Sequence, residues 1–420
     1  MYKWVVWVAC IIVFILLFMQ VGIQFTTPPP ASRLVMLRDI PLPSAFPDPA
    51  RTARSPFTPG TALLFDHFDF QALDPQTHLL FIAHSGPGPD KEQLVNPHFN
   101  PDTDAKNDGN VLIFDTRQQK IVGLLNIPQV AGMVAAPDLH KVYAADSNDN
   151  IIYDIDEKTL KTTQIPLQDN DSPDGIGYDP EDHLLMVSDP GTPANPDKTN
   201  VIDRKNQNET LIDALTDKIV ARVMLGVDGK WGDDVGHVRF DPQLHRIFVA
   251  VQQLPDPDSP DPNLLPPPGT SWLVAIDPLT HTVATRLKLP DFCLSPHGLG
   301  IDTATHIAFI ACVDTSPASL LRVDLQKMKA IEEAPWPVET NPDMINFDLP
   351  LHLLYVSSSA GITIFKEDGR AFQWLGSYTY GVNTHSLALD EETHDIYIPL
   401  AKVGGRPILR IMHYNIAQYP

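Results

Sequence analysis

Seven histidines along this 420-residue chain are each preceded by a turn and followed by a burst of β-branched and aromatic residues. The histidines are His78, His140, His183, His245, His306, His352 and His394. The segments that follow them read LLFIA, KVYAA, LLMVS, RIFVA, IAFIA, LLYVS and DIYIP. Similarity that recurs every several tens of residues is typical of a repeat protein, whose units pack against their neighbours. The repeats therefore predict one large domain rather than the two or three that the length alone would suggest.

The repeat between residues 295 and 335 indicates what each unit contains. Turns separate four short apolar segments, at 299–301, 307–312, 320–324 and 330–333. Four antiparallel strands in about forty residues make one blade of a β-propeller. The same order begins near His67, Ala131, Asp174, His237, Asp343 and His385. The sequence therefore predicts an all-β fold, a seven-bladed propeller of four-stranded antiparallel blades.

The last repeat is one strand short. Its strands are expected near 386–389, 395–399 and 408–413, after which the sequence stops at Pro420. Residues 33–41 resemble the fourth strands of other blades. We therefore expect 33–41 to be the outer strand of the last blade, which closes the ring and covers a sheet edge.

The N-terminus differs from the rest of the chain. Residues 4–23 are apolar apart from Gln20 and Gly22, and no charge follows Lys3 until Arg33. Twenty helical residues span about 30 Å, the thickness of the hydrocarbon core. We expect an uncleaved single-pass transmembrane helix (a signal-anchor) that keeps the propeller outside the cytoplasm, and a cleaved signal peptide is the alternative. The predicted domains are the anchor (1–23), a linker (24–32), the propeller (33–414) and a tail (415–420).

Charge and cysteine use limit the partners and the compartment. The chain has 52 acidic and 30 basic residues, so nucleic acid is not an expected partner. Membrane contact is expected only through the N-terminal helix, and we expect a monomer. Cys10 lies in the apolar segment, leaving Cys293 and Cys312 in the exported part. They flank one predicted hairpin and could form a disulfide or two buried thiols.

Three repeats carry insertions, roughly at 84–109, 190–208 and 253–269. All three fall between the second and third predicted strands of their blades. In a four-stranded antiparallel blade these loops emerge on the face that also carries the connections between blades. Loops of this length are usually functional or disordered. We therefore expect them to overhang one face of the ring.

The seven repeat histidines are predicted to be structural. Each follows a tight turn of the type Asp74-Pro75-Gln76-Thr77-His78. The symmetry of the ring places them far apart, on the face opposite the insertions. We expect them to form hydrogen bonds between neighbouring blades.

Polar residues at the start of the innermost strands are the candidate ligand site. Seven of them are expected to converge on the mouth of the central channel: His67, Asp69, Asp174, His237, His297, Asp343 and His385. Carboxylates and imidazoles suit a divalent metal ion or an acid–base pair. A possible metal set is Asp174, His297 and His385. The alternative is that these residues simply build the turns between blades.

Two repeats carry a family resemblance. The segments SPHGLGIDTATHIAFIACVD and SPDGIGYDPEDHLLMVSDPG resemble the repeats of YncE-like, YVTN-type β-propellers, and the resemblance covers roughly residues 33–414. It implies an exported seven-bladed domain that binds its ligand at the channel mouth, here at His297 and Asp174. Related propellers include surface binding proteins, lactone-hydrolysing enzymes and metal-dependent hydrolases and lyases. The early glutamate of the lactonase metal sets has no convincing match here.

Two functions follow as hypotheses. The first is a non-catalytic binding or scaffolding protein, anchored in the membrane, that holds a small molecule or protein at the channel mouth. The second is a lactonase-like hydrolase or lyase, in which a divalent metal ion polarises the carbonyl of a small ester or lactone. No phosphate-binding loop and no nucleophile elbow occurs in the sequence.

Overall fold

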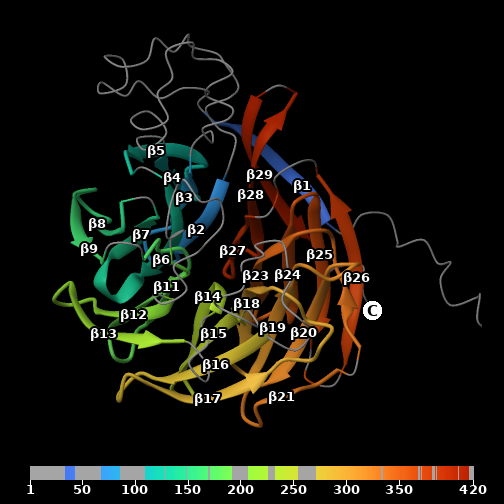
Figure 1. Ribbon diagram of the computed structural model, residues 1–420. Helices are drawn as coiled ribbons and strands as arrows, with labels where there is room; N and C mark the ends of the chain where they lie inside the picture. Colours follow the sequence, from blue (N-terminus) through green and yellow to red (C-terminus); the bar gives the residue numbers. More distant parts are fainter. Residues whose placement is uncertain are drawn as a thin grey trace, which may run out of the picture. The chain divides into compact units, whose positions relative to one another are not determined.

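The computed structural model describes residues 34–42, 68–85, 109–127, 129–147, 149–168, 171–191, 207–225, 232–253, 271–332, 334–367, 369, 371–380, 384, 386–404 and 406–415. Residues 36–413 belong to one compact unit. It consists of seven antiparallel sheets, which are the blades of a propeller (Figure 1). The predicted all-β, seven-bladed propeller fold is confirmed.

The first three blades follow one another along the chain. Blade 1 contains β2 (Phe68–Asp74), β3 (Leu79–His84), β4 (Asn110–Asp115) and β5 (Lys120–Leu125). Blade 2 contains β6 (Val130–Ala136), the 3-10 turn η2 (Pro137–Leu139), β7 (Lys141–Asp146), β8 (Ile151–Asp156) and β9 (Thr162–Pro166). Blade 3 contains β10 (Ile176–Asp179), β11 (Leu184–Asp189), β12 (Asn208–Asp213) and β13 (Lys218–Met224).

The remaining blades include one with an extra strand and one that uses the N-terminal strand. Blade 4 contains β14 (Gly232–Asp241), β15 (Arg246–Gln253), β16 (Ser271–Asp277) and β17 (Thr282–Lys288). Blade 5 contains β18 (Pro296–Asp302), β19 (Ile307–Cys312), β20 (Ser319–Asp324), β21 (Lys329–Ala330) and β22 (Trp336–Pro337). Blade 6 contains β23 (Pro342–Asp348), β24 (Leu353–Ser358), β25 (Gly361–Glu367) and β26 (Phe372–Thr379). Blade 7 contains β27 (Ala388–Asp390), β28 (Asp395–Val403), β29 (Arg406–Tyr414) and β1 (Leu34–Pro41).

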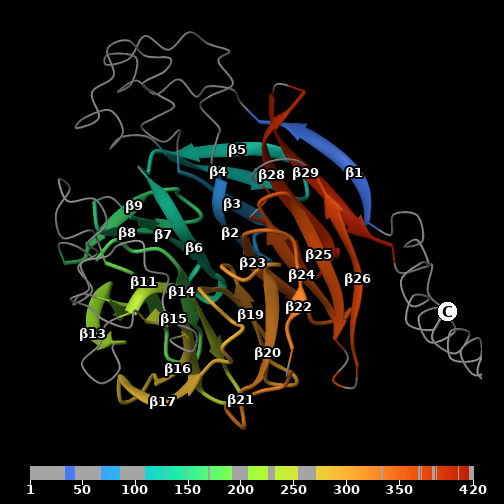
Figure 2. The same ribbon diagram turned by 45° about the vertical axis from the view of Figure 1, so that its right-hand side comes forward.

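The innermost strands form a closed circle. Each contacts its successor in the order β2, β6, β10, β14, β18, β23 and β27, and β27 contacts β2 again. Figures 1 and 2 show these strands around the centre, with the last strand of each blade at the rim. The predicted closure is also confirmed, because β1 pairs with β29 as the outer strand of blade 7. Arg410 makes a two-pronged ion pair with Asp39 across this seam, at 2.8 and 2.7 Å.

Blade 5 departs from the predicted pattern at its outer edge. A single fourth strand was expected at 330–333, but β21 and β22 share that edge and both pair with β20. Between them, the Glu332 carboxylate accepts the backbone N–H of Arg322 at 3.0 Å and so takes the place of a backbone carbonyl. Pro335 and Pro337 have no N–H to donate to a ladder. Side-chain chemistry thus divides the strand in two.

The core lies between the blades, because both faces of each inner sheet are covered by neighbours. All six residues of β11 are buried, and Phe81, Phe114 and Phe309 are fully buried at blade faces. Burial of a large apolar side chain stabilises a fold by about 1.5–3 kcal/mol. Near-continuous apolar runs in the middle strands are therefore what a propeller requires.

The turns between first and second strands hold the blades together on one face. All seven repeat histidines adopt left-handed backbone conformations, with φ between 50° and 60°, which His tolerates better than most residues. The side chains of four of them reach aspartates of the preceding blade. The closest atoms of these pairs lie 2.8–3.1 Å apart for His183–Asp138, His245–Asp182, His306–Asp241 and His394–Asp348. The predicted structural role between blades is confirmed for these four.

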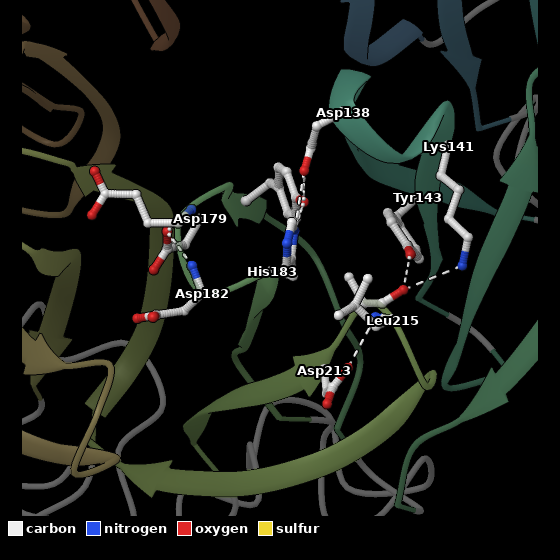
Figure 3. A network of polar contacts seen from close by, with 11 residues as sticks. Asp138, Lys141, Tyr143, Asp179, Asp182, His183, Asp213 and Leu215 are labelled. Atoms are coloured by element: carbon white, nitrogen blue, oxygen red, sulfur yellow. Dashed lines mark hydrogen bonds and ion pairs between the residues drawn. The ribbon is translucent and has the colours of Figure 1, made fainter.

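The contact between blades 2 and 3 shows how extensive such networks are (Figure 3). Asp138 accepts a hydrogen bond from the Tyr178 hydroxyl and lies 3.1 Å from His183 Nδ1, which also contacts that hydroxyl. Nearby, the Tyr143 hydroxyl and Lys141 both donate to the backbone carbonyl of Ala214, at 3.1 and 3.2 Å. Polar groups that span two sheets are thereby satisfied and fix the register of one blade on the next.

Cys293 and Cys312 form a disulfide, which settles the alternative that the sequence left open. Both cysteines are fully buried. The bond ties the segment before β18 to the end of β19. It therefore fixes the chain immediately before His297.

Several predicted features lie outside the described residues. They include the anchor at 1–23, the linker at 24–32 and most of the three insertions, whose flanking strands are as predicted. Within the part of the chain that the structure describes, no helix has the length and apolar character needed to span a membrane. The anchor, the linker and the domain boundaries stay predictions.

Candidate functional site at the channel mouth

A shared irregularity positions the residues at the start of the innermost strands. In five of these strands the pairing with the second strand skips two residues, which form a bulge. The bulged pairs are Asp69-Phe70, Ala131-Gly132, Gly236-His237, His297-Gly298 and Asp343-Met344. A bulge re-aims side chains, and bulges are over-represented next to functional sites. The candidate residues therefore lie where the sheets stop being regular.

Two glycines let the bulges of blades 4, 5 and 6 approach closely. A Cβ on Gly236 would lie 2.3 Å from the backbone oxygen of His297. A Cβ on Gly298 would lie 1.8 Å from the backbone oxygen of Asp343. No other residue type fits such distances without moving the backbone. Glycine at these two positions brings three polar side chains from three blades together.

His237, His297 and Asp343 form the candidate site. One ligand atom from each lies within 4.8 Å of the others. His237 Nε2 is 3.0 Å from Asp343 Oδ1, and His297 Nε2 is 3.7 Å from the same oxygen. The two imidazole rings are 5.1 Å apart and inclined at 57°. Two imidazoles and one carboxylate thus face a common point.

His237 is the most unusual member of the three. It is fully buried, and burial lowers the pKa of its imidazole to about 4, against the opposing effect of Asp343. Its Nε2 is close to Asp343, but neither ring nitrogen makes a properly aligned hydrogen bond to the described residues. Buried polar groups are nearly always hydrogen-bonded, so an exception calls for a ligand or a functional reason. A neutral imidazole with unused lone-pair capacity suits a metal ion or a ligand donor.

An aromatic ring from blade 1 packs against His237. The ring centroids of Phe70 and His237 are 4.6 Å apart, and Phe70 is almost fully buried. Blades 1 and 4 are not neighbours in the ring, so this contact crosses the channel. Phe70 thereby supplies an apolar wall to the site, which lowers the local dielectric and strengthens electrostatic interactions there.

Arg239 adds a positive charge two residues further along β14. Burial lowers its pKa to about 10, and the charge of Asp343 acts in the opposite direction. Arg239 also disfavours protonation of His237. Its guanidinium donates to the backbone carbonyl of Val238 at 2.8 Å. The site therefore contains a cation whose charge interacts with its carboxylate.

The predicted mouth residues have different outcomes. His67 and His385 lie outside the described residues, so the predicted metal set of Asp174, His297 and His385 stays a prediction. Asp69 lies on the bulge of β2, where its carbonyl accepts a hydrogen bond from Ser386. Asp174 precedes β10, and its N–H donates to the carbonyl of Ser188 at 3.0 Å. The carboxylate of Asp174 is not among the three ligand groups that cluster.

Sequence reasoning did not identify Phe70 or Arg239 as part of the site. Phe70 has the apolar character of an ordinary core residue, and nothing in the sequence indicates that it reaches across the ring. Arg239 occupies the position filled by Gly177 and Gly300 in two other blades. The other blades have Ala72, Val134, Asn346 and Ala388 there, so a charge at this position in one blade alone was the available signal.

A second group of potential metal ligands lies at the repeat turns. Asp179, Asp182 and His245 place their ligand atoms within 4.8 Å of one another. Asp179 accepts the N–H groups of its own turn, and Asp182 pairs with His245 of the next blade at 3.0 Å. Asp179 Oδ1 and Asp182 therefore already have partners, whereas Asp179 Oδ2 is buried without a hydrogen bond to the described residues. Because most of its members are engaged in contacts within and between blades, this group is the weaker candidate for a metal site.

Comparison with known proteins supports the fold and no family. No family model matches the chain, and no curated protein matches it. Among solved structures, a chain of Kuenenia stuttgartiensis hydrazine synthase is similar, with 12% identity and a TM-score of 0.58, over 81% of this chain and 94% of that one. A chain of a mitotic checkpoint complex is also similar, with 6% identity and a TM-score of 0.60, over 93% and 96%. The propeller fold is shared, and the resemblance to YncE-like propellers stays a prediction.

Proposed function

We propose that this protein is a membrane-anchored binding propeller that holds a small polar ligand at the channel mouth, outside the cytoplasm. The observation that carries the ligand site is the meeting of His237, His297 and Asp343 on the bulges of three successive blades. A scaffold that needed only a rigid ring would gain nothing from a buried imidazole without hydrogen-bond partners.

The proposed location has three supports. The apolar segment at 4–23 has the length of a membrane span, and Lys3 favours a cytoplasmic N-terminus. The Cys293–Cys312 disulfide is typical of proteins that fold in an oxidising compartment. The acidic surface agrees with a domain that stays off anionic lipid headgroups.

The location is tested with reporters fused to the C-terminus of the full chain. Alkaline phosphatase, which is active only after export, should be active in the fusion, and a cytoplasmic fluorescent reporter should be dark. The protein should stay in the membrane pellet after carbonate extraction. Release into the soluble fraction with a shortened N-terminus would instead indicate a cleaved signal peptide.

The ligand site is tested by thermal-shift screening of the purified full chain in detergent. The panel contains small carboxylates, phosphates, sugars and amines. A genuine ligand should raise the melting temperature of the wild type but not of His297→Asn. His281→Asn is the matched control, because His281 lies at the β16–β17 turn, away from the mouth. Stabilisation that persists in His297→Asn would place the binding site elsewhere.

A further inference from the structure

We infer that His237, His297 and Asp343 form a binding site for one zinc-type divalent transition-metal ion, and that this ion receives the ligand of the channel mouth. The inference rests on the proposed function for the position of the ligand, and the ion itself rests on the geometry of the three side chains. Each of them comes from a different blade, so the site exists only in the assembled ring.

The distances fit a tetrahedral ion. Zinc binds histidine nitrogen and carboxylate oxygen at about 2.0–2.2 Å, so two ligand atoms in a tetrahedral site lie about 3.3 Å apart. The distances from Asp343 Oδ1 to His237 Nε2 and His297 Nε2 are 3.0 and 3.7 Å. The remaining distance, between the ligand nitrogens of His237 and His297, is within 4.8 Å. Small side-chain rotations bring all three atoms to the required separation.

Hydrogen bonding points the same way. A direct His237–Asp343 pair would explain the short distance, but the two groups are not aligned as an N–H donor and its acceptor. Metal coordination uses the nitrogen lone pair rather than an N–H. Coordination would therefore supply the partner that a fully buried imidazole otherwise lacks.

The donor set selects the class of ion. Two imidazoles and one carboxylate are typical of zinc, iron, cobalt and nickel sites, whereas calcium and magnesium prefer oxygen ligands throughout. Three protein ligands leave at least one coordination position open, as in zinc sites that bind a substrate or water. A divalent ion held by two neutral imidazoles and one carboxylate keeps a net positive charge. The open position therefore favours a ligand with a carboxylate or phosphate group.

The test uses the tag-free full chain in detergent after chelator dialysis. We expect zinc titration calorimetry to give one equivalent per chain, with magnesium and calcium giving no heat. Cobalt should give visible absorption bands of tetrahedral intensity. His297→Gln and Asp343→Asn should each weaken zinc binding by at least about 100-fold, beyond the range for substitutions of groups outside the coordination shell.

The second histidine–carboxylate group supplies the matched control. His245→Asn and Asp182→Asn alter a group of similar composition and should leave zinc affinity unchanged. Near-ultraviolet circular dichroism establishes that each variant is folded. Arg239→Gln should tighten zinc binding several-fold, because it removes a nearby positive charge. That increase would not arise from a merely structural role of the mouth residues.

Two results would overturn the inference: less than one equivalent of zinc bound by the folded wild type, or equal loss of binding in the mouth and control variants. Neither would remove the proposed function, which fails separately if no compound in the thermal-shift panel depends on His297. If zinc binds but no compound of the panel depends on His297, the metal site stands and its role in holding a ligand is rejected. The two proposals can therefore be rejected independently.

Discussion

The two faces of this propeller use the same residue types for different purposes. On the face of the repeat turns, a histidine recurs in every blade, and His183, His245, His306 and His394 each pair with an aspartate of the preceding blade. At the channel mouth, His237, His297 and Asp343 come from three blades and converge on one point. Pairwise contacts between neighbouring blades accompany a structural role, and convergence of several blades on one point marks the candidate site. The residue types alone would not distinguish the repeat-turn residues from the mouth residues.

The close packing of the mouth gives the largest expected effect. Gly298→Ala should lower the free energy of unfolding by more than about 3 kcal/mol, because the new Cβ overlaps the backbone of Asp343. Gly175→Ala is the matched control, since its Cβ would lie no closer than 3.4 Å to any neighbour and should cost less than about 1 kcal/mol. Chemical denaturation measures both. Equal stability of the two variants would show that the bulges of blades 5 and 6 need no glycine.

Breaking the Cys293–Cys312 disulfide tests whether binding at the mouth depends on the segment that precedes His297. The bond spans 19 residues of sequence, and a loop of this size contributes about 3 kcal/mol. Mild reduction should lower the melting temperature and weaken binding at the mouth, because Cys293 precedes His297 by four residues. The double variant Cys293→Ser, Cys312→Ser should be insensitive to reductant. An unchanged melting temperature of the reduced wild type would contradict the expectation.

On the opposite face, His306→Ala should destabilise the fold by about 2 kcal/mol. The substitution removes a 2.8 Å hydrogen bond to buried Asp241 and puts alanine into a left-handed backbone conformation. His306→Asn tolerates that conformation and should recover part of the loss. Binding at the mouth should not change in either variant. A variant that loses ligand binding at the mouth but keeps its stability would contradict the expectation that the two faces act independently.

The smallest effect is a pH dependence of stability. Glu157, on the face of the repeat turns, is buried, and burial together with nearby Asp74 raises its pKa from 4.5 to about 7. A carboxyl with a raised pKa contributes its full stability below pH 4.5 and loses it as the pH rises through about 7. The full shift corresponds to about 3 kcal/mol, and relaxation and solvent screening reduce it, so Glu157→Gln should remove a decline on the order of 1–2 kcal/mol across that range. Its Thr77 partner can still donate to the amide oxygen. Parallel pH curves for wild type and variant would contradict the assignment.

The fold was largely predictable because its determinants are local and repeated. Asp-Pro turns, alternating strands and the match of residues 33–41 to an outer strand were enough to predict the blades and their closure. The outer edge of blade 5 was not, because the Glu332 side chain replaces a backbone acceptor there. Sequence patterns describe backbone pairing and do not indicate such a substitution.

The sequence predicts where the site lies, but it does not predict which of the candidate residues meet there. His237, His297 and Asp343 were among the candidates because they precede innermost strands. Which of them meet depends on the bulges, which turn two consecutive residues toward the centre in the same blade. The contact of Phe70 with His237 depends on the width of the ring. Both are properties of the assembled sheets, and no single repeat contains them.

The pairing of β1 with β29 has a consequence for biogenesis. Among the described strands, β1 is translated first and β29 last, so the ring can close only after β29 has been synthesised. Until then β1 has no strand to pair with. Its pairing with β29 joins residues far apart in the sequence, and such contacts form slowly.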